Sequence, residues 1–325
     1  MTPLLRLLAL SSALLCGVGH VQAATSLDLS RYAVTGSYAL DTLGDMGLEA
    51  SAITYARDRG SLFFVGDEGL GVVEISRTGQ TLGSMAFDWT GTGSTHNDAE
   101  GLTYLGGGQL VVVDERPQIA YRFNFSNGGT AALSSQPWAA ITGSTASVGN
   151  VGTEGISYDP RDGSFFSVKQ DDPAVLRQST LTFAAGGGTA TTTELFSGGS
   201  SLFGLNSLSD VQTLAGVDPL AGTHAADHLL VLSLASKKLI EIDRSGNFVS
   251  SFDLSGVTSQ AIEGVTIDEL GTIYLAAEDS GTGASRLFVL SASPVPEPES
   301  WALLTGGLAL IGWRARRRQP ASRPA

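Results

Sequence analysis

One pattern returns five times along the chain, and it limits the possible folds more than any other feature of the sequence. Each copy has an acidic or small polar start, an apolar run, a turn rich in Gly and Asp, and a second apolar run that ends in polar residues. The copies begin at Glu49, Asp98, Gly152, Ser207 and Ala261, so their spacings are 49, 54, 55 and 54 residues. A period of this length is typical of proteins built from repeated supersecondary units.

The repeated unit consists of short β-strands. Its runs are rich in Val, Ile, Phe and Tyr and are separated by Gly/Asp turns, and no segment shows a sustained helical period. A third run follows in each copy and a fourth in most, and four strands per repeat are typical of propeller blades. We therefore predict an all-β chain with a single propeller of five four-stranded blades. A sixth blade within the insertions 126–150 or 184–206 is the alternative.

The ends of the repeat array predict how the ring closes. The fifth copy has only three strands before Ser293, whereas the segment "YAVTGSYAL" at 32–40 precedes the first copy and has no partner there. Pairing of this N-terminal strand with the last blade would complete that blade and leave no open sheet edge. The propeller is therefore predicted over residues 24–293.

The acidic residues of the repeats are predicted to meet at one end of the channel. The first strand of each blade lines the channel of a propeller, and the second strand runs in the opposite direction, so first-strand starts and second-strand ends reach the same face. The first-strand starts include Glu49, Asp98, Glu100, Glu154 and Glu263. The second strands end at Asp67, Glu68, Asp114, Glu115 and Glu278, and in the third copy at Lys169.

Crowded carboxylates repel one another unless they are protonated or a cation lies among them. Oxygen ligands suit Ca²⁺, whereas Zn²⁺ favours Cys and His. We predict Ca²⁺ as the cofactor, with a ligand set that comprises Glu100, Glu154, Glu263, Asp67 and Asp114. Two other interpretations stay open: the Glu-Gly pairs are structural, with Gly allowing close strand packing, or the acids take part in acid–base catalysis.

A catalytic site here would be that of a metal-dependent hydrolase of an ester, lactone or phosphoester. The candidate catalytic residues are Asp98, Asp114, Glu278 and Lys169, with Arg116 as a further cationic group. Covalent acyl transfer is disfavoured because the chain has no G-x-S-x-G element. His224 and His228 are spaced as a helical metal pair but their flanks are typical of a loop, and His96 is expected to be solvated.

Several of these segments resemble one family. "NDAEGLTYLGGGQLVVVDER", "TEGISYDPRDGSFFSVKQDDP" and "AIEGVTIDELGTIYLAAE" are similar to the SdiA-regulated family of bacterial β-propellers, which is related in pattern to esterase-like phytase and gluconolactonase-like propellers. The resemblance implies a propeller over residues 30–293. It implies no particular activity, because the family has no settled reaction. The fourth copy departs from the pattern, because it has Ser207-Leu208-Ser209-Asp210 where Asp-x-Ser-Gly is usual. One carboxylate is therefore either lost or moved to Asp210.

The N-terminus has the pattern of a secretory signal peptide. Residues 1–23 contain one Arg, an apolar run from Leu7 to Val18 and the cleavage-site triplet Val21-Gln22-Ala23. The only cysteine, Cys16, lies inside this segment. The mature chain is therefore predicted to be exported without any disulfide.

The C-terminus, residues 294–325, has three parts in a fixed order. Val295-Pro296-Glu297-Pro298 is followed by the apolar stretch Trp301 to Trp313 and then by an Arg cluster at 314–318. The apolar stretch is short for a transmembrane segment, which needs about 20 residues. The order resembles the PEP-CTERM sorting signal, which implies processing by an exosortase in a Gram-negative bacterium. We expect contact with a membrane only through this segment, before processing.

Charge narrows the range of partners. Without Arg6, the five tail arginines, Glu297 and Glu299, the body keeps 13 basic and 30 acidic residues, a net charge of −17. Such a chain repels nucleic acid. We predict a surface or matrix protein that binds exopolysaccharide or envelope proteins, with the hydrolase as the alternative. Trp138, Phe196 and Phe203 in the long insertions either stack on sugars or pack the loops onto the body.

Overall fold

The structure is a computed structural model that describes residues 25–41, 43–198, 202–293, 306–309 and 311. The signal-peptide prediction for residues 1–23 lies outside the described residues, as does most of the predicted sorting signal. No helix among the described residues is both long enough and apolar enough to span a membrane. The strands all lie in one compact unit, Ala23–Ser293.

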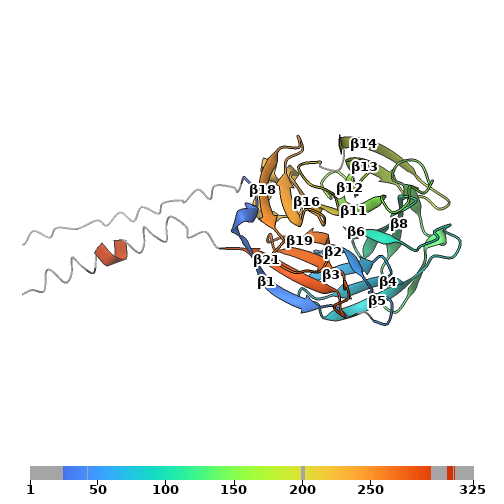
Figure 1. Ribbon diagram of the computed structural model, residues 1–325, viewed down its shortest axis with the longest axis horizontal. Helices are drawn as coiled ribbons and strands as arrows, with labels where there is room; N and C mark the ends of the chain where they lie inside the picture. Colours follow the sequence, from blue (N-terminus) through green and yellow to red (C-terminus); the bar gives the residue numbers. More distant parts are fainter. Residues whose placement is uncertain (1–24, 42, 199–201, 294–305, 310, 312–325) are drawn as a thin grey trace, which may run out of the picture. The chain divides into compact units, whose positions relative to one another are not determined.

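Five sheets, each with four antiparallel strands as its blade, surround a central axis, as predicted (Figure 1). Blade 1 contains β2 (Ala50–Ala56), β3 (Ser61–Gly66), β4 (Gly71–Ile75) and β5 (Thr81–Asp88). Blade 2 contains β6 (Ala99–Gly106), β7 (Gln109–Asp114), β8 (Ile119–Asn124) and β10 (Trp138–Ala140). Blade 3 contains β11 (Thr153–Tyr158), β12 (Phe165–Lys169), β13 (Ala174–Thr182) and β14 (Thr189–Gly198). Blade 4 contains β15 (Asp210–Thr213), β16 (Leu229–Ser233), β17 (Lys238–Ile242) and β18 (Phe248–Asp253).

Blade 5 joins the two ends of the array. It contains β19 (Ile262–Ile267), β20 (Ile273–Ala277), β21 (Arg286–Ala292) and, as its outer strand, β1 (Tyr32–Ala39). β1 pairs with β21 from Tyr32 opposite Ala292 to Ala39 opposite Arg286. The prediction that the N-terminal strand closes the ring is confirmed.

The long insertions supply outer strands and not a sixth blade. The first provides β10, and also β9 (Thr130–Ala132), which pairs in parallel with β5 as a fifth strand of blade 1. The second insertion contains the whole of β14, which pairs with β13. Within residues 25–293, the remaining regular elements that the structure describes are the short 3-10 helices η1 (Leu29–Arg31), η2 (Leu133–Ser135), η3 (Asp218–Leu220) and η4 (His224–Asp227).

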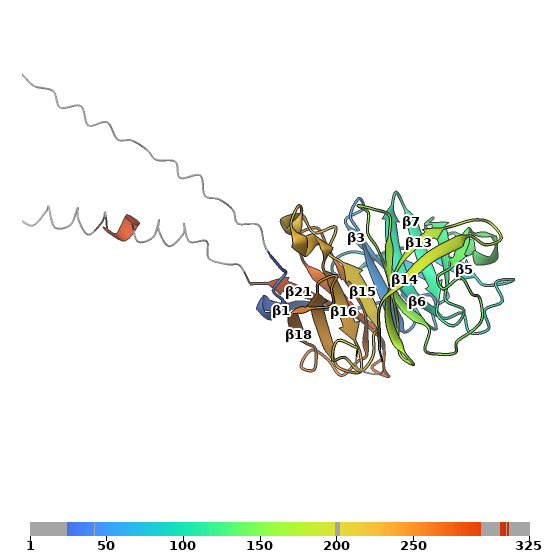
Figure 2. The same ribbon diagram turned by 90° about the horizontal axis from the view of Figure 1, so that it is seen from above.

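The core lies between the blades, because each sheet is covered by a neighbour on both faces (Figure 2). Every residue of β3 is buried, in keeping with its continuous apolar run. Between blades 1 and 2 the rings of Phe87 and Phe123 meet edge to face with centroids 5.4 Å apart. Burial of such aromatic side chains is a large part of the hydrophobic stabilisation of a domain.

The glycine of the Glu-Gly pair has a packing role. A Cβ atom on Gly264 would lie 2.9 Å from the backbone oxygen of Ser51, and one on Gly155 would lie 2.6 Å from the Cα of Asp210. These contacts are shorter than a side chain tolerates, so adjacent inner strands reach this separation only where one of them has glycine. The structural interpretation of the glycines therefore agrees with the observed packing.

Candidate metal centre

The inner strands form a closed ring around the channel. β2 contacts β6, β6 contacts β11, β11 contacts β15, β15 contacts β19, and β19 contacts β2. All five strands start at the same end, which we call the acidic end. The residues at the equivalent position near these starts are Ser51, Glu100, Glu154, Ser209 and Glu263.

The three axial glutamates influence one another. Burial raises the pKa of Glu100 well above its usual range, and the charge of Glu263 raises it further. Burial also raises the pKa of Glu154, which is only 6% exposed, with Glu100 as the next cause. The pKa of Glu263 is raised by burial and by Glu278. Without a cation, these groups are therefore held towards the protonated form.

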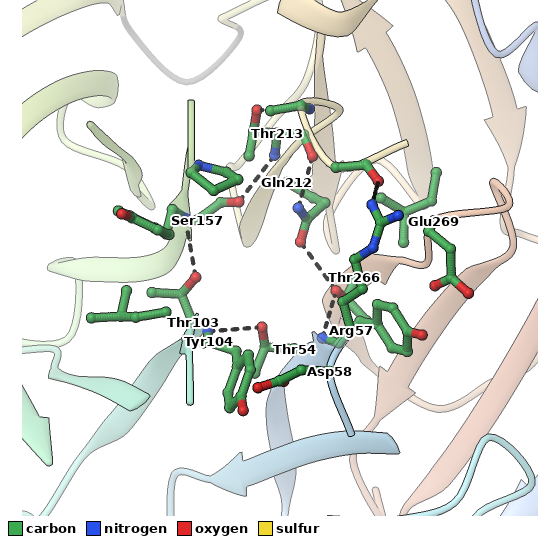
Figure 3. Close-up of a pocket in the computed structure, with 18 residues that line it drawn as sticks. Thr54, Arg57, Asp58, Thr103, Tyr104, Ser157, Gln212, Thr213, Thr266 and Glu269 are labelled. Carbon is green, nitrogen blue, oxygen red and sulfur yellow. Dashed lines mark hydrogen bonds between the residues drawn. The ribbon is translucent and has the colours of Figure 1, made fainter. Parts of the chain in front are cut away.

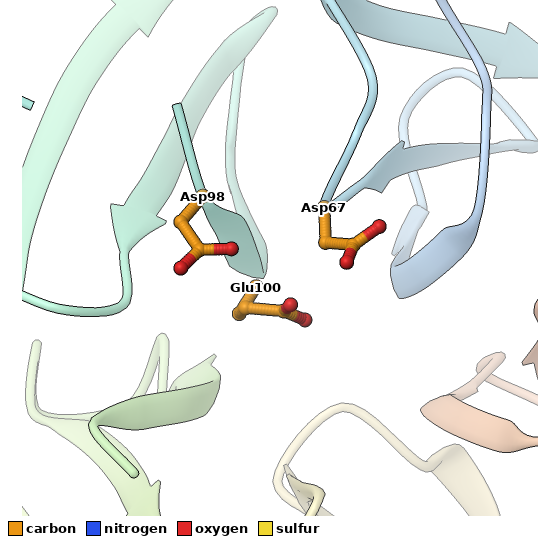
Figure 4. Close-up of side chains that lie close together, drawn as sticks. All are labelled: Asp67, Asp98 and Glu100. Carbon is orange, nitrogen blue, oxygen red and sulfur yellow. The ribbon is translucent and has the colours of Figure 1, made fainter. Parts of the chain in front are cut away.

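Three carboxylates at this end form a close group (Figure 4). Asp67, Asp98 and Glu100 each offer one oxygen, and these oxygens all lie within 4.8 Å of one another. Asp67 directly follows β3 in blade 1, whereas Asp98 and Glu100 belong to the start of β6 in blade 2. Burial raises the pKa of Asp67 to about 6, assisted by the charge of Glu278. This group could hold a metal ion at the boundary between blades 1 and 2.

Two further acids lie at the end of β7. Asp114 pairs in register with Ala99 and is 1% exposed, and neither of its carboxylate oxygens has a hydrogen-bond partner among the described residues. Burial raises its pKa to about 7. Glu115 accepts a 2.8 Å hydrogen bond from the backbone N–H of Gly152 through Oε1, and its buried Oε2 has no partner within the described chain.

The predicted cationic groups at this end are engaged with the protein. Arg116 donates from Nε to Oδ2 of Asp98 at 2.6 Å and also contacts Asn150. Lys169 is buried, and its Nζ donates to the backbone carbonyls of Asp171 and Pro173. Both side chains therefore already have partners within their own blades.

Glu278, the remaining candidate base, lies beside Glu263 at the end of β20. Its pKa is raised, mainly by burial and also by the charge of Glu49. Glu49 accepts a hydrogen bond from the backbone N–H of Asp279 at 3.2 Å. Blades 5 and 1 therefore both place acidic residues at the acidic end of the channel, as their strand positions predict.

Blade 4 brings a serine to the axis where three other blades bring glutamate. Ser209 accepts the backbone N–H of Leu234 at 3.0 Å. Asp210 points between strands, where its two oxygens accept the backbone N–H groups of Val211 and Val265, each at 2.7 Å. The carboxylate that we expected to be lost or moved is therefore present at Asp210 but bonded to the backbone of the next blade.

The three histidines of the propeller lie in different environments. His228 is buried, and its Nδ1 lies 2.7 Å from Oε1 of Glu241, while His224 begins η4. His96 is exposed and contacts the hydroxyl of Thr95 at 2.8 Å. Zinc chemistry based on the pair His224 and His228 gains no support from these contacts.

The aromatic residues of the insertions pack onto the body. Trp138 lies in β10 against the core of blades 1 and 2. Phe196 and Phe203 meet edge to face with centroids 5.2 Å apart. These contacts agree with the packing alternative.

Sequence reasoning missed three features. Asp98 was assigned to the catalytic candidates and left out of the ligand set, although its carboxylate lies with those of Asp67 and Glu100. Glu115 was recognised as a strand-end acid but was left out of the ligand set, although its side chain influences the pKa of both Glu100 and Glu154. A cavity of about 600 Å³ at the opposite end of the channel was not predicted (Figure 3). A signal for it exists, because a hydroxyl residue stands three positions after the axial residue in four copies: Thr54, Thr103, Ser157 and Thr266.

The solved structures that match the chain share little sequence with it. The chain is 15% identical to a structural genomics protein of unknown function from Bacteroides thetaiotaomicron VPI-5482, covering 75% of this chain and 60% of that one, with a TM-score of 0.47. It is 13% identical to the Cps50 (Swd1) β-propeller domain of Myceliophteria thermophila, covering 76% and 66%, with a TM-score of 0.37. It is 8% identical to a streptogramin B lyase, covering 82% and 99%, with a TM-score of 0.44. At this level of similarity we draw nothing about activity.

Two family matches divide the chain where the repeats end. Residues 294–318 match the PEP-CTERM protein-sorting motif, which implies recognition by an exosortase and export across the inner membrane of a Gram-negative bacterium. Residues 26–280 match the SdiA-regulated family. This second match covers most of the chain and nearly the whole five-bladed propeller, so the chain belongs to the SdiA-regulated family.

Proposed function

We propose that this exported propeller binds a divalent cation at the acidic end of its channel and acts as a binding or structural protein of the cell surface, outer envelope or extracellular matrix. The observation that carries the proposal is the approach of Asp67, Asp98 and Glu100, whose oxygens lie within 4.8 Å of one another. Ca²⁺ fits best because all the groups are hard oxygen ligands and are numerous enough for its high coordination number.

The surroundings of these three carboxylates favour a bound cation over a purely structural role for the acidic residues. Burial and the charges of Glu263 and Asp67 raise the pKa of Glu100. Asp114 has two buried carboxylate oxygens without partners among the described residues. A buried carboxylate without a partner is costly, and a bound cation offsets that cost. We place Asp67, Asp98 and Glu100 nearest the ion, with Glu154, Glu263 and Asp114 as the further acids that it neutralises.

The test is the metal content and melting temperature of the purified protein before and after chelation, beside a Glu100→Gln, Glu154→Gln double variant. We expect stoichiometric calcium in the unsubstituted protein, a lower melting temperature after chelation, and loss of both effects in the variant. The control is Asp88→Asn, Asp253→Asn, which changes the net charge equally at exposed positions of β5 and β18. Absence of metal, with a melting temperature unaffected by chelation, would refute the cation site.

A metal-dependent hydrolase is the second candidate, and one observation favours it. The pKa of Asp114 is raised to about 7, which suits a general base near neutral pH. The engagement of Lys169 and Arg116 within their own blades favours binding over catalysis. A screen with ester, lactone and phosphoester substrates in the presence of calcium separates the two, since a hydrolase would lose activity in Asp114→Asn and a binding protein would show none.

A further inference from the structure

The opposite end of the channel holds a second cavity that the cation proposal does not use. It occupies about 600 Å³ and is lined by residues at the C-terminal ends of all five inner strands. This volume lies within the range of about 300–1,000 Å³ that is typical of small-molecule sites. We call it the distal cavity.

The floor of the distal cavity is a ring of hydroxyl side chains that link adjacent blades (Figure 3). Thr54 accepts the backbone N–H of Tyr104 at 3.1 Å, and Thr103 accepts that of Tyr158 at 3.0 Å. Ser157 accepts the N–H of Thr213 at 3.0 Å. In each case, a hydroxyl of one blade satisfies an amide of the next.

Three of these hydroxyl groups keep a proton to donate. A hydroxyl that accepts one N–H still carries its own O–H, and no acceptor for the O–H of Thr54, Thr103 or Ser157 exists among the described residues. All three side chains are at most 5% exposed. Thr266 differs, because it donates to Oε1 of Gln212 at 3.1 Å. The floor therefore presents three buried donors, which suit a ligand rich in acceptor oxygens.

The walls are aromatic and held in place. Tyr55, Tyr104 and Tyr158 line the cavity from three successive blades. The guanidinium of Arg77 lies 4.9 Å from the ring centre of Tyr55, and the ring of Phe63 stacks on Tyr104 with centroids 5.9 Å apart. Fixed tyrosine rings offer flat apolar surface at low entropic cost.

The charged groups at the rim are already paired. Arg57 contacts Asp218 at 2.9 Å, and Glu269 contacts Arg77 at 3.2 Å. Asp58 accepts the backbone N–H of Gly107 at 2.9 Å. Arg57 is the arginine that lines the cavity, and an anionic ligand would have to displace Asp218 from it. The cavity therefore favours a neutral ligand over an anionic one.

We propose that the distal cavity binds a neutral saccharide unit. A pyranose combines acceptor oxygens for the three floor hydroxyl groups with an apolar C–H face for the tyrosine walls, and it carries no charge. This inference goes beyond the cation site and does not depend on it. It also locates sugar recognition away from Trp138, Phe196 and Phe203, for which the sequence left stacking on sugars open as one of two alternatives.

The test blocks the cavity without disturbing the hydroxyl ring. Gly216 lines the cavity, a Cβ atom there would meet nothing within 4 Å, and its backbone does not need glycine. Gly216→Trp should fill the entrance. Gly256→Trp is the matched control, because Gly256 has the same free space but lies after β18, outside the cavity. Ala215→Tyr is a second blocking variant, which keeps the test open if Gly216→Trp fails to fold.

The purified full-length protein is tested by saturation-transfer NMR with maltose, cellobiose, lactose and N,N′-diacetylchitobiose. We expect at least one disaccharide to bind with millimolar affinity, and binding to weaken at least about tenfold in the blocked variants and to stay unchanged in the control. We also expect it to survive chelation of divalent cations. Absence of binding by all four sugars, binding that persists in the blocked variants, or binding lost on chelation would overturn the proposal.

Discussion

Single residues at the inner strands decide what each end of the channel can do. Three blades place glutamate at the acidic end, and the fourth replaces the Glu-Gly pair with Ser209-Asp210. Asp210 is 4% exposed and uses both oxygens to hold backbone amides. Its position is chemically different from that of the axial glutamates, although it lies only one residue further along its strand.

Removal of the Asp210 side chain should destabilise the propeller. Asp210→Ala leaves the buried N–H of Val265 without its acceptor, which costs about 1–3 kcal/mol. Asp253→Ala is the control, because Asp253 accepts the N–H of Ser255 at an exposed position, where water can take its place. Urea unfolding curves measure both free energies. Equal losses in the two variants would contradict the assignment of a buried blade-to-blade contact to Asp210.

Asp114 should make the stability of the metal-free protein depend on pH. Burial raises its pKa from 3.8 to about 7, so between these values the folded state holds a proton that the unfolded state has released. Its stabilising contribution is therefore fully present below about pH 4 and is lost as the pH rises through about 7. After chelation, this one group should lower the free energy of unfolding by up to about 1.4 kcal/mol per pH unit in that window.

Denaturant titrations across this pH range test the contribution of Asp114. The Asp114→Asn variant has no proton to lose at this position, so its free energy of unfolding should fall less steeply with pH. A slope that Asp114→Asn does not change would show that the Asp114 carboxyl group is ionised in the folded state.

At the level of elements, β1 has the task of closing the ring. It pairs with β21 along seven residues and carries Tyr32, which is buried and donates its hydroxyl to the carbonyl of Gly271 at 2.7 Å. Without β1, the outer edge of blade 5 would expose the unpaired backbone groups of β21. Unpaired strand edges are sites of association between chains.

A chain that starts at residue 41 should therefore melt at a lower temperature and form oligomers. A chain that ends at residue 293 loses a comparable length from the other end but keeps every strand. Its melting temperature and propeller structure should therefore match those of the full-length protein. Thermal melts and size-exclusion chromatography with light scattering distinguish these outcomes. A monomeric, unchanged protein after loss of β1 would mean that closure does not depend on this strand.

At the level of the whole molecule, the propeller and the sorting motif are separate parts of the chain. The propeller strands end at Ala292, and the sorting motif begins at residue 294. The stability of the propeller depends on packing between its blades, whereas the function of the motif depends on recognition by an exosortase.

Substitution of Pro296, Glu297 and Pro298 by Ala should therefore block processing and leave the propeller folded. We expect the unprocessed chain to stay with the cell membranes in fractionation, whereas the purified protein keeps its melting temperature. Ala substitution of the exposed pair Asp88 and Asp253 serves as a control that should leave processing unchanged. Normal release of the substituted chain would show that these residues are not needed for sorting.

The sequence by itself determined the five blades, the closing strand and the end of the channel at which the acids gather. These features follow from strand periodicity, turn residues and a regular repeat, which are all local properties of the chain. The tertiary structure alone decided that Asp67 of one blade meets Asp98 and Glu100 of the next, that Asp210 bonds to backbone and that Lys169 is engaged. It also placed the hydroxyl ring under the distal cavity. Such contacts depend on how closely neighbouring blades approach and on side-chain orientation, neither of which the spacing of residues along one strand specifies.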